Sequence, residues 1–294
     1  MKIAFVGKFG KIYDEEYIAR SFESIDHLVL RIPMSTSWSD IIGNLLKFRP
    51  DVLIYSKWNY PNEIDKTIEI LRRSGMKTVC WLFDLYFDYH REHQVGLMKF
   101  FRSDYVISTD NGHNHRWPKY DIKHACVRQG IYKDECYMLP MKEIEYDIVF
   151  VGSDSPIYPE RTKIMLKLDK IFNFKWFGKK NTDELRSTEL NELYSKSLIV
   201  VGDSFYSPHY WSNRIVETLG RGGFLIHREV EGLKEEYPFL VTYDGSFEDL
   251  VDKINYYLIH LDERESLRKR NFEWVRERYT MDLQCKRLIE CINQ

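Results

Sequence analysis

The sequence lacks the features that mark disulfide-bonded, zinc-binding or membrane-spanning proteins. Its five cysteines include no C-x-x-C pair, so neither a disulfide framework nor a zinc site is indicated. No stretch approaches the roughly 18 apolar residues of a membrane span, and Met1 and Lys2 lead directly into an apolar run rather than a signal peptide. We therefore expect a cytoplasmic protein with no membrane span and no bound metal.

A strong charge of either sign is also missing. The 43 Lys and Arg residues nearly balance 45 Asp and Glu residues, which gives a formal net charge of −2. This balance speaks against a dedicated surface for duplex DNA, because such a surface needs many cationic contacts to phosphates. What the chain does have is 44% hydrophobic and 30% charged residues over a length of 294, which is typical of a globular protein with about two domains.

Short apolar runs recur along the chain, and longer amphipathic stretches separate them. Because the runs are continuous rather than alternating, they are typical of strands buried on both faces of a parallel sheet. The expected strands are Lys2–Val6, His27–Leu30, Asp51–Tyr55, Thr78–Phe83, Asp104–Ser108, Ile122–Val127, Asp147–Gly152, Phe174–Phe177, Leu198–Gly202, Phe224–Ile226 and Phe239–Tyr243. The expected helices include Asp14–Ser24, Trp38–Phe48, Asn62–Ser74, Ile157–Ile171, Asp183–Ser195 and Asp262–Tyr279. This alternation, repeated twice, predicts two doubly wound α/β domains.

A break in the pattern separates the two halves. Residues 133–146 have no clean period, contain Pro140 and mix charged with apolar residues, which predicts a linker. We expect a Rossmann-like domain on each side of it, over residues 1–132 and 147–279, and a C-terminal helix over 280–294 that packs back on the first domain. Parallel sheets of this kind bind ligands at the carboxyl ends of their strands, here in a cleft that the two domains face.

The segment WSNRIVETLGRGGFLIH, residues 211–227, combines a helical face with a glycine-rich turn. Asn213, Glu217 and Arg221 recur every four residues, so these polar side chains share one side of a helix. A carboxylate accepts hydrogen bonds from a ribose diol, and bare backbone N–H groups receive phosphate oxygens. The segment is therefore a candidate nucleotide site. The alternative is a solvated glutamate followed by glycines that only cap the helix and turn the chain.

On these residues the chain resembles the GT-B glycosyltransferases, and in particular the group 1 transferases that include the CgeB-like spore-maturation proteins. In the C-terminal half the likeness runs through DIVFVGS (147–153), KWFG (175–178), IVVGD (199–203) and the segment 211–227. In the N-terminal half it is thinner and consists of FVGKFG (5–10), CWLFD (80–84) and SDYVISTD (103–110). The resemblance implies the GT-B fold, in which two Rossmann-like parallel-sheet domains face each other across a cleft.

The same resemblance implies a donor site in the C-terminal domain. Glu217 takes the place of the glutamate that binds the ribose of a nucleotide-sugar donor. The other residues expected to contact the donor are Arg161, Phe177, Gly178, Ser212, Asn213, Arg214, Gly222 and Gly223. Arg161 and Arg214 would meet the diphosphate, and Phe177 would lie at the nucleobase. For Arg161 a solvated position in the first turn of its helix is the alternative, and for Phe177 a place in the core.

Two further positions concern the sugar and the reaction itself. Related retaining transferases carry two glutamates eight positions apart, and this chain has His209 where the first of them would stand. His209 would donate to a phosphate or a sugar hydroxyl, or it is a structural residue. Gly7 begins a weak G-x-x-G turn that lacks the third glycine of a Rossmann fingerprint, and it would allow close approach of a sugar.

We expect retaining transfer, whereas an inverting enzyme would need a general base from the N-terminal domain. Asp84, at the end of an expected strand, is the best placed candidate for that base. Its alternative is an ordinary aspartate at a strand end.

The expected activity is transfer of a hexosyl or pentosyl group from a UDP- or GDP-sugar to an acceptor hydroxyl. Arginines and helix termini would stabilise the leaving diphosphate, so no metal and no tightly bound cofactor are required. The acceptor stays open between a glycan, a small molecule, a protein and modified DNA. The alternatives are a sugar-nucleotide epimerase or hydrolase of the same fold, and a nucleotide-sugar binding protein without catalysis.

Overall fold

Each of the eleven apolar runs forms a strand in the computed structural model, and all pairings between these strands are parallel. The strands are β1 (Lys2–Gly7), β2 (Leu28–Pro33), β3 (Val52–Tyr55), β4 (Lys77–Leu82), β5 (Tyr105–Ser108), β6 (His124–Cys126), β7 (Tyr146–Val151), β8 (Phe174–Phe177), β9 (Ser197–Gly202), β10 (Leu225–Arg228) and β11 (Val241–Tyr243). They form two sheets, ordered β2-β1-β3-β4-β5-β6 and β11-β10-β9-β7-β8.

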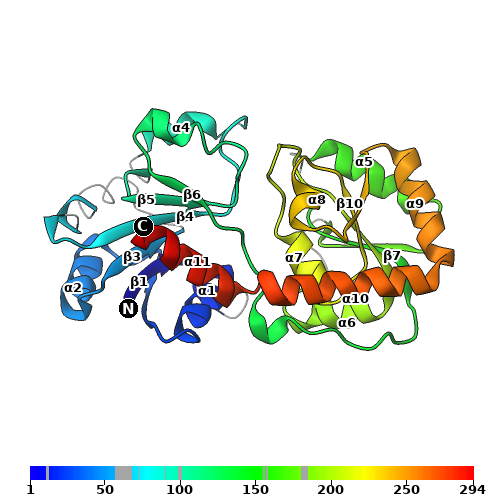
Figure 1. Ribbon diagram of the computed structural model, residues 1–294, viewed down its shortest axis with the longest axis horizontal. Coiled ribbons are helices and arrows are strands. Elements are labelled where there is room, and N and C mark those ends of the chain that lie inside the picture. Colours follow the sequence, from blue (N-terminus) through cyan, green and yellow to red (C-terminus); the bar gives the residue numbers. More distant parts are fainter. Residues whose placement is uncertain are drawn as a thin grey trace. The chain divides into compact units, whose positions relative to one another are not determined.

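The two sheets belong to two compact units (Figure 1). Unit 1 comprises Met1–Tyr132 together with Met281–Gln294, and unit 2 comprises Lys133–Thr280. The structure describes residues 1–10, 13–56, 68–71, 73–89, 91–98, 101–154, 156, 158–179 and 185–294. None of the helices in these ranges combines the length and apolarity needed to cross a membrane.

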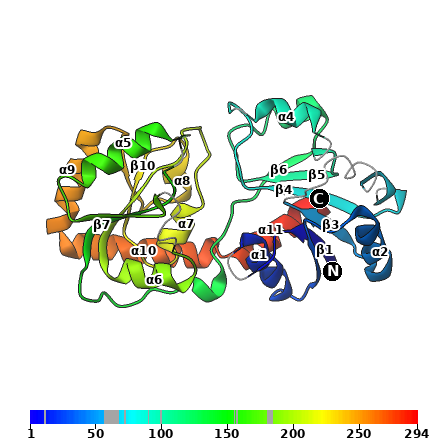
Figure 2. The same cartoon turned by 180° about the vertical axis from the view of Figure 1, so that it is seen from behind.

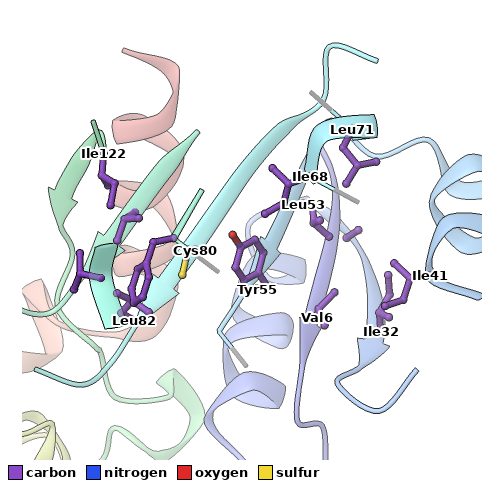
Figure 3. Close-up of a cluster of buried hydrophobic side chains, with 14 of the residues drawn as sticks. Val6, Ile32, Ile41, Leu53, Tyr55, Ile68, Leu71, Cys80, Leu82 and Ile122 are labelled. Carbon is purple, nitrogen blue, oxygen red and sulfur yellow. The ribbon is translucent and has the colours of Figure 1, made fainter. Parts of the chain in front are cut away.

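Unit 1 has helices on both faces of its six-stranded sheet. Its helices are α1 (Asp14–Glu23), α2 (Trp38–Phe48), α4 (Glu92–Leu97) and α11 (Met281–Asn293). Helices α1 and α11 pack on one face, and α2 with the helical residues 68–71 covers the other. Figure 3 shows this second core, in which Tyr55 and Cys80 lie on neighbouring strands. Residues 62–67 and 72 of the expected helix 62–74 lie outside the described residues.

Helix α11 belongs to unit 1 although it follows unit 2 in the chain. Cys285, Leu288 and Ile292 recur at helical spacing and are fully buried against the face that α1 covers. At the start of this helix the Met281 N–H donates to the carbonyl oxygen of Ile131 at 2.7 Å. Unit 1 is therefore built from two chain segments that are far apart in the sequence.

Unit 2 is a five-stranded sheet, also with helices on both faces. Its helices are α5 (Pro159–Leu168), α6 (Thr188–Ser195), α7 (Arg214–Leu219), α8 (Leu233–Glu236), α9 (Phe247–Ile259) and α10 (Leu261–Arg278). Helices α5 and α9 share one core, while α6 and α7 lie together on the other face with α10 against α7 (Figure 2). Helix α9 begins with a side-chain cap, because Ser246 Oγ accepts from the Asp249 N–H at 3.2 Å. Of the expected helix 183–195, residues 183 and 184 lie outside the described ranges.

Residues 133–146, for which we expected a linker, are part of unit 2. Glu135 and Cys136 are buried there, and Asn191 Nδ2 donates to the carbonyl oxygens of Glu135 at 3.0 Å and Tyr137 at 2.7 Å. The segment up to residue 145 forms no strand, and its backbone bonds partly to the Asn191 side chain and partly to backbone groups such as the carbonyl oxygens of Ser195 and Lys196. A search for periodicity therefore misses its burial.

The strand order of unit 2, read as β8-β7-β9-β10-β11, reverses between β7 and β9. In doubly wound sheets, ligands bind outside the carboxyl ends of the strands at such a reversal. Here those ends are Val151 with Gly152 and Gly202 with Asp203. In unit 1 the corresponding reversal lies between β1 and β3, where β1 ends at Gly7.

Candidate functional site

An arginine bridges the carboxyl ends of the two strands between which the order of unit 2 reverses. Arg214 begins α7, and its Nε donates to the carbonyl oxygen of Val151 at 2.7 Å. Its Nη1 donates to the carbonyl oxygen of Asp203 at 2.8 Å. The guanidinium also lies over the ring of Phe150, 4.9 Å from its centroid. Arg214 is thus held at the place where this fold binds ligands.

A second arginine meets the same aspartate. Arg161, in the first turn of α5, has its Nε 3.3 Å from Asp203 Oδ2 and its Nη2 3.3 Å from the Asp203 carbonyl oxygen. Only 5% of Arg161 is exposed, so the alternative of a solvated position in its helix is wrong. We call Arg161, Asp203 and Arg214 the arginine cluster. The cluster contains two guanidinium groups and one carboxylate, which leaves an excess of positive charge.

This excess of positive charge is one of two causes that lower the pKa of Arg214, and burial is the larger one. Burial, reinforced by the charge of Arg161, lowers the pKa of Arg214 to about 10, although Asp203 acts in the opposite direction. The group still carries its proton near neutral pH, but in surroundings that disfavour the charge. A bound anion would remove that penalty, and hydrogen bonds from guanidinium groups to phosphate oxygens are among the stronger ones in proteins.

A relay of hydrogen bonds fixes the loop between β9 and α7. His227 Nδ1 lies 2.6 Å from the carbonyl oxygen of Arg228, which only accepts, so Nδ1 carries the hydrogen. His227 Nε2 therefore accepts from Ser204 Oγ at 3.0 Å, and Ser204 Oγ accepts from the Ser212 N–H at 3.0 Å. Burial lowers the pKa of His227 to about 3, which keeps the imidazole neutral. The sequence analysis missed this relay because its members are separated in the chain.

Three backbone N–H groups before and at the start of α7, those of Tyr210, Ser212 and Arg214, are already used within their own loop. The Tyr210 N–H donates to the carbonyl oxygen of Ser207 at 3.2 Å, and the Arg214 N–H donates to Ser212 Oγ at 3.2 Å. These N–H groups are therefore not bare donors for a phosphate. Asn213 is exposed, and its Oδ1 lies 3.5 Å from Ser212 Oγ. In this loop the side chains of Arg214 and Asn213, rather than the N–H groups, are available for a ligand.

The glycines after α7 close the helix. The Gly222 N–H donates to the carbonyl oxygen of Leu219 at 3.0 Å, and the Gly223 N–H donates to that of Thr218 at 2.9 Å. This pair of bonds, with a φ of 74° at Gly222, is a Schellman cap. The expectation that Gly222 and Gly223 offer bare N–H groups to phosphate is wrong, because the helix end already takes both donors. The capping alternative describes these two residues.

Glu217 lies one turn along α7 from Arg214 and is partly exposed, with 26% of its side chain accessible. Arg221 Nη1 donates to Glu217 Oε2, and Arg221 Nη2 donates to Glu135 Oε2. The spacing of Glu217 and Arg221 predicted that they share a helix side, and their contact confirms it. We call Glu135, Glu217 and Arg221 the glutamate triad. Glu135 could not be found from the sequence, since it lies in the irregular segment 133–146.

The KWFG segment ends β8 beside the reversal point. Phe177 is buried and makes an edge-to-face contact with Tyr146, with the ring centroids 5.8 Å apart. Gly178 has a φ of 85°, and a Cβ atom there would lie 3.2 Å from the carbonyl oxygen of Gly152. Trp176 Nε1 donates to that same oxygen at 2.7 Å. Phe177 thus contributes to packing, and Gly178 is required for close approach to the end of β7.

His209 lies in the loop between β9 and α7, with a left-handed backbone (φ 54°). Its N–H donates to the carbonyl oxygen of Glu231 at 2.9 Å, and its Nε2 lies 3.8 Å from Glu231 Oε1. The imidazole packs against Gly232, where a Cβ atom would collide with it. Partly exposed and held by the 231–232 turn, His209 has a defined orientation.

The two candidates of unit 1 lie at carboxyl ends of its strands. Asp84 follows β4, its side chain is 64% exposed, and its Oδ2 accepts from Arg91 Nη1 at 2.6 Å. Gly7 ends β1, and a Cβ atom there would lie 2.8 Å from Glu15 Cγ. Close packing against Glu15 thus explains on structural grounds why position 7 is a glycine.

Unit 1 also contains a network of charged side chains that could not be found from the sequence. His113 lies between two carboxylates, with Nδ1 2.8 Å from Asp110 Oδ2 and Nε2 2.8 Å from Asp88 Oδ2. Arg116 Nη1 donates to Asp88 Oδ1 at 2.6 Å. The hydrogen bonds from His113 and Arg116 lower the pKa of Asp88. The network ties together the loops that follow β4 and β5, and so supports the loop that carries Asp84.

Solved glycosyltransferases share this fold. The chain is similar to a glycosyltransferase from Rickettsia africae, at 13% identity over 98% of this chain and 97% of that one, with a TM-score of 0.65. It is similar to a UDP-forming α,α-trehalose-phosphate synthase from Burkholderia vietnamiensis, at 9% identity over 100% of both chains, with a TM-score of 0.61. An α1,3-fucosyltransferase solved with GDP-fucose matches at 13% identity over 99% and 89% of the chains, with a TM-score of 0.53.

The two doubly wound sheets and these neighbours show the GT-B fold. The chain belongs to the glycosyl transferase-like family, whose model matches residues 138–290. The matched region includes the arginine cluster, α7 and most of unit 2. No curated protein matches the chain.

Proposed function

We propose that the chain transfers a sugar from a nucleoside-diphosphate sugar to an acceptor hydroxyl, and that unit 2 binds the donor. The observation that carries this proposal is Arg214, whose guanidinium spans the ends of β7 and β9 at the reversal of strand order. With Arg161 beside it and one carboxylate against them, the cluster suits a diphosphate. A neighbour of the same fold solved with GDP-fucose supports a donor of this kind.

Helix α7 places a carboxylate at a suitable separation from the cluster. Glu217 follows Arg214 by three positions, a rise of about 4.5 Å along the helix. A cation at the diphosphate and a carboxylate one turn away match the order of groups in a nucleotide, where the ribose diol lies next to the phosphates. We therefore assign the ribose hydroxyls to Glu217 and the diphosphate to Arg161 and Arg214. We place the nucleobase near Phe177 and Gly178.

In the reaction, the bond between the sugar's anomeric carbon and the diphosphate breaks, and its electron pair leaves with the diphosphate. The acceptor oxygen forms the new bond and loses its proton. The arginine cluster would stabilise the charge on the leaving group by fixed cations, so the transfer needs no metal at this point. We propose retention of configuration, supported by the resemblance to retaining transferases, and membership of the CgeB-like subgroup. His209 would contact the donor, Gly7 would allow close approach of the donor or acceptor sugar, and in the inverting alternative Asp84 would be the general base.

The donor site is tested by replacing Glu217 with alanine. A hydrogen bond to a charged group contributes roughly 1.5–3 kcal/mol, so E217A is expected to weaken nucleotide binding by more than about tenfold. Calorimetric titration with UDP, GDP, ADP and TDP measures this, and circular dichroism checks that the variant is folded. Unchanged affinity in folded E217A would refute the assignment of Glu217.

Turnover assays separate the proposed transfer from its alternatives. Incubation with each sugar nucleotide, with and without an acceptor panel of glycans, small molecules, proteins and modified DNA, follows release of the diphosphate. Acceptor-dependent release supports a transferase, and NMR of the product shows whether the anomeric configuration is retained. Epimer formation without acceptor would identify an epimerase, and binding without turnover would identify a binding protein.

A further inference from the structure

We infer that Arg221 is a positioning residue for Glu217, which it ties to the buried Glu135 so that the Glu217 carboxylate is presented to the ribose diol. This inference rests on the proposed role of Glu217 in donor binding. It concerns discrimination between ribose and deoxyribose, which is the ratio of two affinities and can change independently of the affinity for either nucleotide.

The contacts of Arg221 leave its guanidinium little freedom. The residue is 3% exposed, and its Nη1 donates to both the carboxylate and the carbonyl oxygen of Glu217, the latter at 3.2 Å. Its Nη2 donates to Glu135 Oε2, and its Nε donates to the carbonyl oxygen of Ser187 at 3.3 Å. Because three nitrogens bond in three directions, rotation of the guanidinium breaks several bonds at once. The carboxylate that it holds is fixed in turn.

The far end of the triad is equally fixed. Glu135 is 5% exposed, its Oε1 accepts from Ser187 Oγ, and its carbonyl oxygen accepts from Asn191 Nδ2 at 3.0 Å. Burial alone would lower the pKa of Arg221, but the carboxylates of Glu217 and Glu135 outweigh it and raise that pKa. Arg221 is thus a permanent cation anchored to an immobile carboxylate.

Stability alone does not account for such a triad. Buried charged groups are costly to desolvate, and apolar residues of similar size often stabilise a fold as well or better. Two carboxylates and one guanidinium give the triad a net negative charge, whereas the arginine cluster has a net positive charge. A negative centre one helical turn from a positive one favours hydroxyl donors at the first and phosphates at the second.

The chemistry of the carboxylate allows both partners. An ionised carboxylate has about four acceptor positions, so the bond from Arg221 does not exhaust it. A glutamate side chain on a helix surface otherwise samples several rotamers, and ordering it on binding costs free energy. With Arg221 in place the Glu217 side chain is already ordered in the folded protein, so binding does not have to order it. The ribose hydroxyls then contact a pre-oriented acceptor.

The test compares UDP and GDP with their 2′-deoxy forms by calorimetric titration. Wild type is expected to prefer the ribose form by about tenfold or more, the typical value of a hydrogen bond to a charged group. E217A is expected to bring this ratio close to one. R221M is expected to bring the ratio down most of the way to that of E217A. E135Q, which keeps the Ser187 bond but removes the buried charge, is expected to give an intermediate ratio.

Arg268 offers a matched control. It is also a buried arginine, and it lies in α10. Its Nη1 donates to the carbonyl oxygen of Gly222, in the turn that follows α7, at 2.7 Å, and its Nε pairs with Glu265 at 2.7 Å. R268M is expected to lower the melting temperature and to keep the wild-type ratio. Should R221M alone not fold, R221M/E135Q removes both buried charges together and is expected to show the same loss of discrimination.

The outcomes distinguish this inference from the proposal beneath it. A wild-type protein without ribose preference, or an E217A variant that keeps one, would overturn the role of Glu217 and this inference together. A normal ratio in folded R221M and in R221M/E135Q, with the ratio lost in E217A, would overturn only the role of Arg221. A loss of the ratio in R268M as large as in R221M would show a general effect of a disturbed helix end, and would also overturn it.

Discussion

At the scale of single residues, His227 shows how burial turns a titratable group into a fixed part of the structure. It is fully buried, donates through Nδ1 and accepts through Nε2, so both ring nitrogens are used in the neutral form. Protonation would put a hydrogen on Nε2 facing Ser204 and would place a charge next to Arg161 and Arg214. The histidine is therefore suited to holding the loop between β9 and α7 and not to proton transfer near neutral pH.

A pH dependence of stability follows from this residue. The folded pKa is about 3, below the ordinary 6.5, so the unfolded chain binds a proton between these values and the folded chain does not. Stability is therefore fully present above about pH 6.5 and is lost as the pH falls towards 3, by at most about 1.4 kcal/mol per pH unit. Urea unfolding at pH 7 and pH 4.5 is expected to show a larger loss in wild type than in H227Q. Equal losses in the two proteins would contradict the assignment.

At the scale of elements, the strands follow from the sequence more completely than the helix ends do. Continuous apolar runs identify strands buried on both faces, and all eleven expected runs contain one. The glycines at 222 and 223 illustrate the limit, because the same residue type serves phosphate binding and helix capping. Only the hydrogen bonds to Thr218 and Leu219 decide between the two uses.

Two glycines give opposite predictions for substitution by alanine. At Gly222 the φ of 74° is left-handed and a Cβ atom would collide with Met138, so G222A is expected to lose more than about 1 kcal/mol of stability. At Gly43, inside α2, a Cβ atom would meet nothing within 4 Å, so G43A is expected to gain up to about 1 kcal/mol. Thermal unfolding of both variants measures this. A gain in stability for G222A would show that the cap is not needed.

The candidate site was predictable in its main residues and not in their partners. Arg161, Arg214 and Glu217 come from a family pattern that follows the chain, so a sequence reading finds them. Asp203 stands in the IVVGD motif, but its contact with Arg161 could not be found from the sequence, and Glu135 lies in the irregular segment 133–146. Folding brings Asp203 to the arginines, because the carboxyl ends of neighbouring strands meet at one edge of a sheet.

At the scale of the whole molecule, unit 1 depends on a helix that the chain reaches only after unit 2. Leu288 in α11 is fully buried in the core that contains Ile3, Phe5 and Phe22. Truncating a buried leucine to alanine leaves a cavity and typically costs roughly 2–5 kcal/mol of the free energy of unfolding.

L288A is therefore expected to destabilise unit 1 by about that amount and to leave nucleotide binding by unit 2 unchanged. Hydrogen exchange read by mass spectrometry is expected to increase in peptides of unit 1 and not in those of unit 2. K286A, at an exposed position of the same helix, serves as the control and is expected to change stability by less than about 0.5 kcal/mol. Equal protection of unit 1 in L288A and wild type would show that α11 is dispensable.

The split of unit 1 between Met1–Tyr132 and Met281–Gln294 sets an order for folding during synthesis. The six strands and α1 are made before unit 2, but the part of the sheet face that α11 covers stays bare until all of unit 2 has been translated. Unit 2 is continuous in sequence, so it can fold completely as soon as it emerges. The nascent chain thus carries an unfinished, apolar N-terminal sheet beside a finished C-terminal unit. Transiently exposed apolar surface of this kind favours aggregation until α11 covers it.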